Sequence, residues 1–349
     1  MKKKTIIITG GAGFIGTNSA KFFLKKNFIV YIFDNFSRKG NHQNISFLRS
    51  EKINLENLKV KKIDIRNKKK IFIYINKIKP DIILHLAGQV AVTTSITNPE
   101  LDLETNILGT FNLLESCRKF SKETFFIYAS TNKVYGKLKH PVFEGKFRYN
   151  IKGKFSGINE NSHLDFYSPY GCSKGAADQY VKDYFRIYNL KTVVLRQSCI
   201  YGKYQYGIED QGWVSWFMIA YILKKKVTIF GSGKQVRDIL FVDDLVKLYY
   251  KLYINKNKVS GDCFNVGGGI SNSMSLLELD KILRNNLKLN TDTVFDLERL
   301  GDQKIFVSDN SKLKKTIKWH PQTSIKQGLS MMFRWLLKNK KKVENTLKK

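Results

Sequence analysis

The sequence has few prolines, cysteines and acidic residues for a chain of 349 residues. It holds 5 Pro and 42% hydrophobic residues, 13% of all residues being aromatic, so a disordered or collagen-like chain is excluded. The four cysteines, at positions 117, 172, 199 and 263, form no C-x-x-C pair, and no histidine cluster accompanies them. The sequence therefore supports no metal site and no disulfide framework.

Long hydrophobic runs are also missing. The longest, Trp213–Leu223, is too short to span a bilayer. The apolar run that follows Lys2–Lys4 stops at Thr9, short of the apolar region of a signal peptide. We expect a soluble cytoplasmic protein without a membrane partner. At ~100–200 residues per domain, its length predicts one large or two modest domains.

The shortage of acids leaves a formal net charge of +32, from 61 Lys and Arg against 29 Asp and Glu. Of the basic residues 50 are Lys, and they are spread along the whole chain. A nucleic-acid-binding protein usually gathers its Arg and Lys on one element, with aromatic residues between them. We therefore expect solvated lysine-rich surfaces and weak, salt-sensitive adhesion to polyanions, and no specific nucleic-acid partner.

Short β-branched runs alternate with longer amphipathic segments in the first 200 residues. The expected strands are 5–9, 28–33, 58–63, 81–86, 124–129 and 192–196, and the expected helices are 14–26, 69–78, 106–119 and 175–188. This rhythm is typical of an α/β fold, a doubly wound (Rossmann) parallel sheet with helices on both faces.

The regular alternation of strands and helices ends near residue 200. We expect a dinucleotide-binding domain over 1–200, to which 236–262 returns, and a smaller mixed α/β substrate lobe over 201–235 and 263–337. A Lys-rich tail, 338–349, is expected to fray. Segment 137–168 lacks periodicity and is long enough for a functional lid.

A glycine-rich turn separates the first strand from the first helix. Glycines at 10, 13 and 16 fit G-x-x-G-x-x-G, which lets the backbone approach a pyrophosphate at the helix N-terminus. Asp34 closes the second strand, where a carboxylate accepts hydrogen bonds from a ribose diol and repels a 2′-phosphate. This favours NAD over NADP, although Arg38 and Lys39 argue mildly the other way, and an ordinary turn residue is the alternative for Asp34.

Segments after the third and fourth strands are placed to line the same cofactor. Asp64 and Ile65 are expected near the adenine, and Leu86–Gln89 beside the cofactor, where small residues allow a close approach. His85 is expected to be a packed core residue.

Tyr170 and Lys174 are four residues apart, so on a helix they share a face. A lysine one turn from a tyrosine can lower the phenol pKa from its usual ~10, which makes the phenolate a general base near neutrality. Thr131, at the end of a strand, can hydrogen-bond the same substrate hydroxyl. A surface Tyr–Lys pair is the alternative, and the dinucleotide turn upstream argues against it.

These motifs together resemble the extended short-chain dehydrogenase/reductases, a family of NAD-dependent nucleotide-sugar epimerases, dehydratases and related enzymes. The resemblance rests on Thr9–Gly16, Asp34, Asn106 with Gly109 and Thr110, Ser130–Gly136 and Tyr170–Lys174. It extends over nearly the whole chain, through 235–238, 242–244 and 299–303. It implies that Arg237 and Arg299 contact the diphosphate and ribose of a sugar nucleotide.

The motifs and the resemblance together give the expected site. The cofactor is expected at Gly10, Gly13, Phe14, Ile15, Gly16, Asp34, Asn35, Ser37, Arg38, Asp64, Ile65, Leu86, Ala87, Gln89, Asn106, Ser130, Tyr170 and Lys174. The substrate is expected at Gln89, Thr131, Asn132, Lys133, Gln211, Trp213, Arg237 and Arg299. Core packing is the alternative for Trp213, and securing a helix start is the structural interpretation of Asn106.

Five longer runs resemble one epimerase branch of the family: 34–40, 87–96, 130–136, 168–179 and 210–214. Asn132 and Lys133 stand where the related dehydratases carry an acid followed by Glu or Lys, and an amide cannot protonate a leaving hydroxide. We therefore predict an isomerase that oxidises a sugar carbon transiently, with catalytic Tyr170, Thr131 and Lys174 and tightly bound NAD. The alternatives are a UDP-sugar 4-epimerase and a nucleotide-sensing protein. The resemblance also implies a homo-oligomer formed through helices 106–119 and 175–188.

Overall fold

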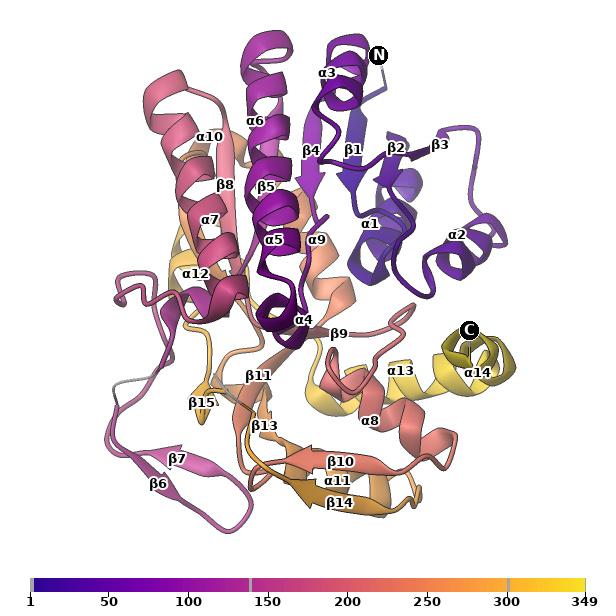
Figure 1. Ribbon diagram of the computed structural model, residues 1–349, viewed down its shortest axis with the longest axis vertical. Coiled ribbons are helices and arrows are strands. Elements are labelled where there is room, and N and C mark those ends of the chain that lie inside the picture. The colour runs from indigo at the N-terminus through magenta and orange to yellow at the C-terminus, as the bar shows by residue number, and fades with distance from the viewer. Residues whose placement is uncertain (1–2, 138–139, 300–301, 349) are drawn as a thin grey trace.

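The computed structural model describes residues 3–137, 140–299 and 302–348. Its centre is a seven-stranded parallel sheet in the order β12-β8-β5-β4-β1-β2-β3 (Figure 1). The strands are β1 (Thr5–Thr9), β2 (Ile29–Asp34), β3 (Leu58–Lys62), β4 (Ile82–His85), β5 (Phe125–Thr131), β8 (Thr192–Gln197) and β12 (Cys263–Val266). Residues of neighbouring strands pair in parallel, so all carboxyl ends meet at one edge.

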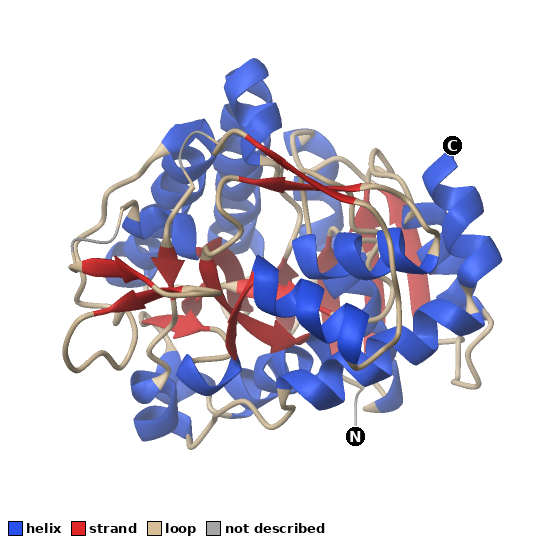
Figure 2. Ribbon diagram, turned by 90° about the horizontal axis from the view of Figure 1, so that it is seen from below, coloured by secondary structure: helices blue, strands red, loops and turns tan. Residues whose placement is uncertain are grey.

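Helices cover both faces of this sheet, as the alternating pattern predicts (Figure 2). Consecutive side chains of a strand point to opposite faces of the sheet, so each face needs a cover of its own. In β1, Ile6 and Ile8 pack in one hydrophobic core and Ile7 packs in the other. The first core includes side chains of α1 (Phe14–Lys25), α2 (Asn41–Arg49), α9 (Val242–Ile254) and α12 (Ser311–Ile317). The second includes side chains of α3 (Lys68–Ile78), α6 (Gly109–Phe120) and α7 (Ser168–Tyr188).

Two helices of the cofactor domain begin earlier than predicted. Helix α7 starts at Ser168, with Pro169 in its first turn, and not at Gly175, so Tyr170 and Lys174 both lie on it. The π-helical segment η1 (Leu103–Leu108) and α5 (Pro99–Asp102) precede α6 without a break, and the non-helical Asn98 separates them from α4 (Val92–Thr97). Asn106 therefore lies within a helical path and does not begin one, which corrects its interpretation as a helix-start residue.

The smaller lobe follows β8 in the chain. It holds β9 (Cys199–Tyr201), β11 (Val236–Phe241), β13 (Ser273–Ser275) and β15 (Ile305–Phe306) in one sheet, and β10 (Val227–Phe230) with β14 (Thr293–Asp296) in another. Its helices are α8 (Trp213–Ile222), α11 (Leu276–Asn285), α13 (Ile325–Lys338) and α14 (Lys340–Lys348). The short α10 (Lys256–Val259) and η3 (Ile270–Asn272) complete the described helices.

The strands differ from the expected division in two places. Strand β11 joins the small sheet, although it lies in the stretch 236–262 that was expected to return to the cofactor domain. Helix α9 of the same stretch does pack on α1 of that domain. Strand β12 joins the central sheet, although it begins the stretch expected in the substrate lobe. Its sequence, CFNV, is too short for periodicity to separate a central strand from a lobe strand.

Segment 137–168 is anchored to the small lobe. Its hairpin, β6 (Val142–Glu144) and β7 (Tyr149–Ile151), is followed by residues that pack with it on Val236 and Ile305. The amide of Tyr149 donates to the carbonyl of Lys234 at 2.9 Å, and that of Ile158 to Val307 at 2.7 Å. Both ends of the segment adjoin catalytic elements, since the 3₁₀ turn η2 (Asn132–Tyr135) precedes it and α7 follows.

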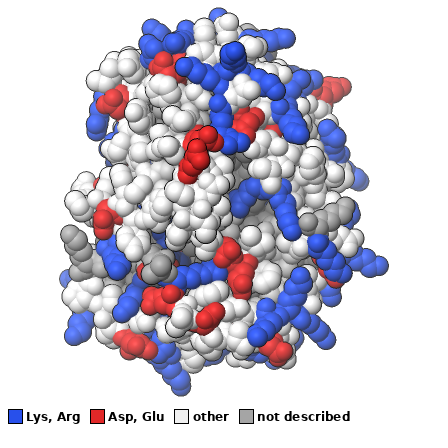
Figure 3. Space-filling model, in the orientation of Figure 1, with Lys and Arg blue, Asp and Glu red and all other residues white. Residues whose placement is uncertain are grey.

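The lysine-rich C-terminal end is helical where it is described. Val343 of α14 is 2% exposed and packs with residues of α8 and α13 in the core of the small lobe. The basic residues are dispersed over the face seen in Figure 3, with acidic residues between them. None of the described helices has the length and apolar character that crossing a membrane requires.

Candidate active site

The glycine-rich turn lies where the carboxyl end of β1 meets α1. Gly10 has a φ of +65°, and a Cβ there would come within 2.9 Å of the Ala87 backbone. A Cβ on Gly16 would lie 2.4 Å from the carbonyl oxygen of Gly10. The turn therefore requires glycine at both positions, and it brings bare backbone to the N-terminus of α1 at Phe14 and Ile15. Such a cradle suits a pyrophosphate.

Asp34 joins this turn to the loop that follows β2. Its Oδ2 accepts a hydrogen bond from the Ala12 amide at 3.0 Å, and its Oδ1 accepts from the Phe36 amide at 2.8 Å and the Asn41 side chain at 3.0 Å. Burial raises the pKa of this carboxyl, while the three donors and the charge of Arg38 lower it. Asp34 is thus more than a turn residue, because it fixes both sides of the predicted ribose site.

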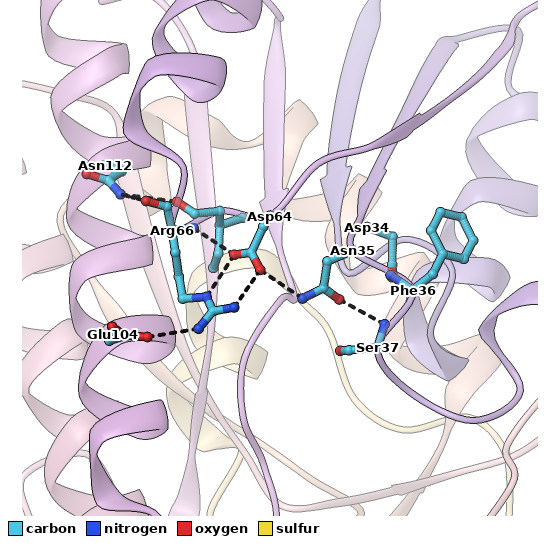
Figure 4. A network of polar contacts seen from close by, with 9 residues as sticks. Asp34, Asn35, Phe36, Ser37, Asp64, Arg66, Glu104 and Asn112 are labelled. Carbon is cyan, nitrogen blue, oxygen red and sulfur yellow. Dashed lines mark hydrogen bonds and ion pairs between the residues drawn. The ribbon is translucent and has the colours of Figure 1, made fainter.

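A polar network borders the predicted adenine site (Figure 4). Asn35 donates to Asp64 at 3.1 Å and accepts from the Ser37 amide at 3.1 Å. Arg66 binds Asp64 through Nε and Nη2 and pairs with Glu104 of η1 at 2.8 Å. Burial raises the pKa of Asp64, but the hydrogen bonds from Arg66 and Asn35 together with the charge of Arg66 bring it below its usual range. Sequence reasoning named Asp64 but missed Arg66, whose role depends on η1 lying beside the loop that follows β3.

The loop after β4 is held from within the protein. The amides of Leu86 and Ala87 both lie 3.2 Å from the Thr9 hydroxyl. The Gln89 side chain accepts from the Ala91 amide at 2.7 Å and donates to the Ala91 carbonyl at 2.8 Å and to Asp102 at 2.6 Å. The amide group of the Gln89 side chain is therefore already hydrogen-bonded to the protein, to Ala91 and Asp102. Nearby, His85 is 1% exposed between Thr9 and Thr110, the packed residue that was expected.

Tyr170, Lys174 and Thr131 come together where β5 ends beside the first two turns of α7. Thr131 lies beside the Tyr170 phenol, where its hydroxyl favours the ionised form of the phenol, and both residues are buried. The Lys174 ammonium donates to the Ala129 carbonyl at 2.6 Å and lies 4.2 Å from the centre of the Tyr128 ring. Ser130 turns away from them and donates to Asp178 at 2.9 Å, and Asp178 is paired in turn with Arg196.

Burial dominates the titration of this pair. It raises the pKa of Tyr170 to about 12, although the neighbouring Thr131 hydroxyl and the charge of Arg38 act in the opposite direction. The lowered phenol pKa that was expected from Lys174 is therefore not found, because burial outweighs the charges around the phenol. Burial lowers the pKa of Lys174 to about 7, although the charges of Asp178 and Asp102 favour the ammonium form. A lysine that titrates near neutrality is poised for acid–base work.

Positively charged side chains line the side of the site formed by the small lobe. Arg237 pairs with Asp302 at 2.6 Å, and Lys133 lies 3.7 Å from the same carboxylate. Arg299 pairs with Asp210 at 3.1 Å, and its guanidinium lies 3.8 Å from the Phe230 ring centre. The motif that carries Arg299 also includes Leu300 and Gly301, which lie outside the described residues.

Gln211 of the same lobe is bonded by Arg38 of the cofactor loop. Trp213 begins α8, and its ring lies 6.3 Å from that of Phe217, so it belongs partly to the small-lobe core. Asn132 follows Thr131 in η2 and accepts from its hydroxyl at 3.4 Å. The predicted substrate residues thus approach the catalytic group from η2, β11 and the 209–213 loop.

Sequence reasoning missed two residues at the centre of the site. Cys199 of β9 lies near the charges of Arg237 and Lys133 and near the phenol of Tyr170. Burial raises the pKa of its thiol, so it is a neutral group in that wall. Asp102, at the end of α5, is 1% exposed and accepts from Gln89 and Ser173. Neither stands in a spacing that indicates chemistry, because β9 and the η1 path were not predicted.

Comparison with known proteins identifies the family of this chain. The family model described as GDP-mannose 4,6 dehydratase matches residues 7–332. A CDP-paratose 2-epimerase of Salmonella typhi is 46% identical over 336 residues, which cover 95% of this chain and 98% of that protein. The chain belongs to the extended short-chain dehydrogenase/reductase family. The matched region includes the glycine turn, the predicted catalytic residues and both arginines predicted to bind substrate.

Solved structures of the family have the same fold. A UDP-glucose 4-epimerase of Thermotoga maritima, crystallised with UDP-glucose, is 28% identical with a TM-score of 0.80 and covers 96% of this chain and 99% of that one. A dTDP-glucose 4,6-dehydratase of Bacillus anthracis, crystallised with NAD, is 27% identical with a TM-score of 0.81, covering 98% and 99%. Family members close in structure therefore differ in reaction, so the site must decide the function.

Proposed function

We propose that this protein is an NAD-dependent nucleotide-sugar epimerase that converts CDP-paratose to CDP-tyvelose. The observation that carries the proposal is the buried Tyr170–Thr131 pair beside Lys174, facing a positively charged wall. The 46% identity with a CDP-paratose 2-epimerase over almost the whole chain supports the choice of sugar.

The residues around the glycine turn fit NAD. Only glycine fits at positions 10 and 16, the N-terminus of α1 is bare, and the buried Asp34 carboxylate stands at the end of β2. Among the described residues, the Ala12 amide alone donates to Oδ2 of this carboxylate, so that oxygen can accept another hydrogen bond from a ribose hydroxyl. NAD held by these residues would supply the oxidising power of the reaction, as acceptor and donor of a hydride at C2 of the sugar.

The protein's own groups move the proton. Tyr170 removes the proton of the C2 hydroxyl as the ring carbon becomes a ketone, and it returns a proton when the ketone is reduced. Thr131 lies beside the Tyr170 phenol, where its hydroxyl can hold the same substrate hydroxyl in line. Lys174, fixed to Ala129, places a positive charge next to the phenolate as it forms.

The charged wall fits the nucleotide end of the substrate. Arg237, Lys133 and Arg299 suit a diphosphate, since guanidinium groups bind phosphate oxygens in pairs. Asn132 occupies the place next to Thr131 where an acid would be needed to expel a hydroxide. The set of groups therefore favours inversion at a carbon over loss of water.

Turnover of a panel of sugar nucleotides tests this proposal. The purified protein, without added NAD, is incubated with CDP-paratose, UDP-glucose and dTDP-glucose, and the products are identified by proton NMR. We expect inversion at C2 of CDP-paratose alone. Inversion at C4 of UDP-glucose, or loss of water from dTDP-glucose, would assign a different reaction.

We also propose that the chain forms a homo-oligomer through one face of the cofactor domain. Leu103 and Leu108 of η1 are about half exposed, and so are Tyr180 and Tyr188 of α7, while Ile187 is 66% exposed. The η1 segment packs beside α7, so these apolar side chains belong to neighbouring elements. A second copy of the same face would cover them, as the resemblance to the family implies.

A further inference from the structure

A buried carboxylate lies behind the catalytic pair. Asp102, the last residue of α5, is 1% exposed. Its Oδ1 accepts from the Gln89 side chain at 2.6 Å, and its Oδ2 accepts from the Ser173 hydroxyl at 3.2 Å and, more weakly, from the Asn106 amide at 3.5 Å. Both oxygens act as acceptors of neutral donors, which is the behaviour of an ionised carboxylate.

The contacts of Asp102 join the cofactor loop to the catalytic helix. Asn106 holds the backbone of Gln89 from both sides, accepting from its amide at 2.9 Å and donating to its carbonyl at 3.1 Å. The same Asn106 donates to Ser173 at 2.9 Å, and Ser173 lies between Tyr170 and Lys174 in the sequence of α7. Asp102 therefore sits where the loop along the predicted cofactor path meets the residues that carry the chemistry.

These hydrogen bonds alone do not require a charge. An asparagine at 102 could accept from Gln89 through its one oxygen, and Ser173 could then donate to the Tyr170 carbonyl, which lies 3.1 Å from its hydroxyl. Such a residue would avoid the free-energy cost of burying a carboxylate. Burial indeed raises the pKa of Asp102, against the hydrogen bonds of Gln89 and Ser173 and the charge of Lys174. The presence of the acid therefore points to a use for its negative charge.

Lys174 is the cation that this charge faces. The side chains around the ammonium group are Asp178 on α7, Asp102 on α5, the neutral His85 on β4 and Tyr128 on β5, with Tyr170 one turn away on α7. Asp178 is bonded to Arg196 through both its oxygens, at 2.9 and 3.1 Å, so its charge is largely balanced. In the described part of the chain, no Lys or Arg forms an ion pair with Asp102.

We propose that Asp102 is a positioning residue whose unpaired negative charge keeps Lys174 in its ammonium form and thereby sets the pH range of catalysis. Burial pushes the pKa of Lys174 to about 7, so a nearby charge decides how much of the lysine is protonated at neutral pH. The same charge raises the pKa of Tyr170. Removing it should therefore lower both pKa values and move the whole pH range of activity downward.

The test removes the negative charge of residue 102 and keeps a side chain of the same shape, in the protein with its cofactor bound. Asp102→Asn is compared with the wild type, with Asp102→Glu, which restores the charge, and with Glu100→Gln, which removes an exposed carboxylate from the same helix. The pH dependence of kcat is measured with CDP-paratose, which rests on the proposed function. Should Asp102→Asn not fold, Asp102→Ser removes the same charge in a smaller residue.

A second readout does not depend on the sugar. The ionisation of Tyr170 is followed by ultraviolet difference absorbance against a Tyr170→Phe background. We expect Asp102→Asn to lower the Tyr170 pKa and both limbs of the pH profile by about half to one unit, and Asp102→Glu and Glu100→Gln to leave the profile near that of the wild type. A uniform loss of kcat with no shift in either readout would overturn the inference. A shift in Tyr170 without turnover of CDP-paratose would sustain it and refute the proposed substrate.

Discussion

The Lys174 ammonium donates a hydrogen bond to the carbonyl of Ala129 at 2.6 Å, which fixes the lysine to the strand that ends at Thr131. Lys174 is therefore held by β5, while Tyr170, on the same helix, lies beside Thr131. The predicted catalytic residues thus come from one strand and one helix, and their relative positions depend on the packing of α7 on β5.

Burial of Lys174 makes the stability of the protein without substrate depend on pH. Its pKa is about 7 in the folded protein and ordinary, near 10.5, in the unfolded chain. Between pH 7 and 9 the unfolded state binds more protons at this residue, so stability should rise with pH, by up to about 1.4 kcal/mol per unit. Urea unfolding at pH 7, 8 and 9 should show this rise in the wild type and a smaller one in Lys174→Met. Equal slopes would place the lysine in a more polar environment than the structure shows.

Tyr170 should be indispensable for turnover and dispensable for folding. Tyr170→Phe removes the group that exchanges the proton and should lower kcat at least about 100-fold, while the protein keeps its NAD. Tyr167→Phe is the matched control, because Tyr167 is 42% exposed just before α7. Product formation and bound NAD are measured on the same preparations. An active Tyr170→Phe enzyme would remove this residue from the mechanism.

Asp34 should control retention of the cofactor. Asp34→Ala breaks the hydrogen bonds to Ala12 and Phe36 and removes the predicted ribose acceptor. We expect the purified variant to contain less NAD than the wild type and to require added NAD for activity. Asp183→Ala, at an exposed position of α7, is the control. The measurement is NAD released on denaturation, and undiminished NAD in Asp34→Ala would contradict the assignment.

Arg237 should act mainly in binding. Arg237→Ala removes a donor from the positively charged wall and leaves Asp302 facing the substrate phosphates. KM for the sugar nucleotide should rise at least about tenfold, with a smaller change in kcat. Arg334→Ala on α13, which is exposed, is the control. A large fall in kcat at constant KM would place Arg237 in the chemical step instead.

The exposed face of η1 and α7 should carry self-association. A charge at Leu108, which is 49% exposed, should prevent a second copy from covering that face. Light scattering should find a smaller assembly for Leu108→Glu than for the wild type. Ile254→Glu adds the same charge at a 60% exposed position at the end of α9 and should change nothing. A monomeric wild type would refute the proposed oligomer.

The sequence predicted the part of the fold that local patterns encode. The strand at Thr5–Thr9 and the helix from Phe14 follow from periodicity and from glycines that only a tight turn requires. It also predicted the fold class and the family, because glycine turn, strand-end Thr131 and Y-x-x-x-K occur in one order along the chain.

What the sequence did not predict depends on contacts between distant segments. Asp102 and Cys199 enter the site through a π-helical path and a three-residue strand, neither of which has a recognisable period. The anchoring of segment 137–168 depends on pairing with residues near 234 and 307. Helix α14 is polar on most sides, and the packing of Val343 and Leu347 on the small lobe explains its order.

The most direct test of transient oxidation at C2 follows the hydrogen on that carbon. CDP-paratose carrying deuterium at C2 is incubated with the purified protein in ordinary water, without added NAD, and the product is examined by NMR. The account predicts that CDP-tyvelose keeps the deuterium at C2, because it leaves and returns on a cofactor that stays bound. Inversion with loss of the deuterium to solvent, or no inversion by a protein that holds NAD, would contradict it.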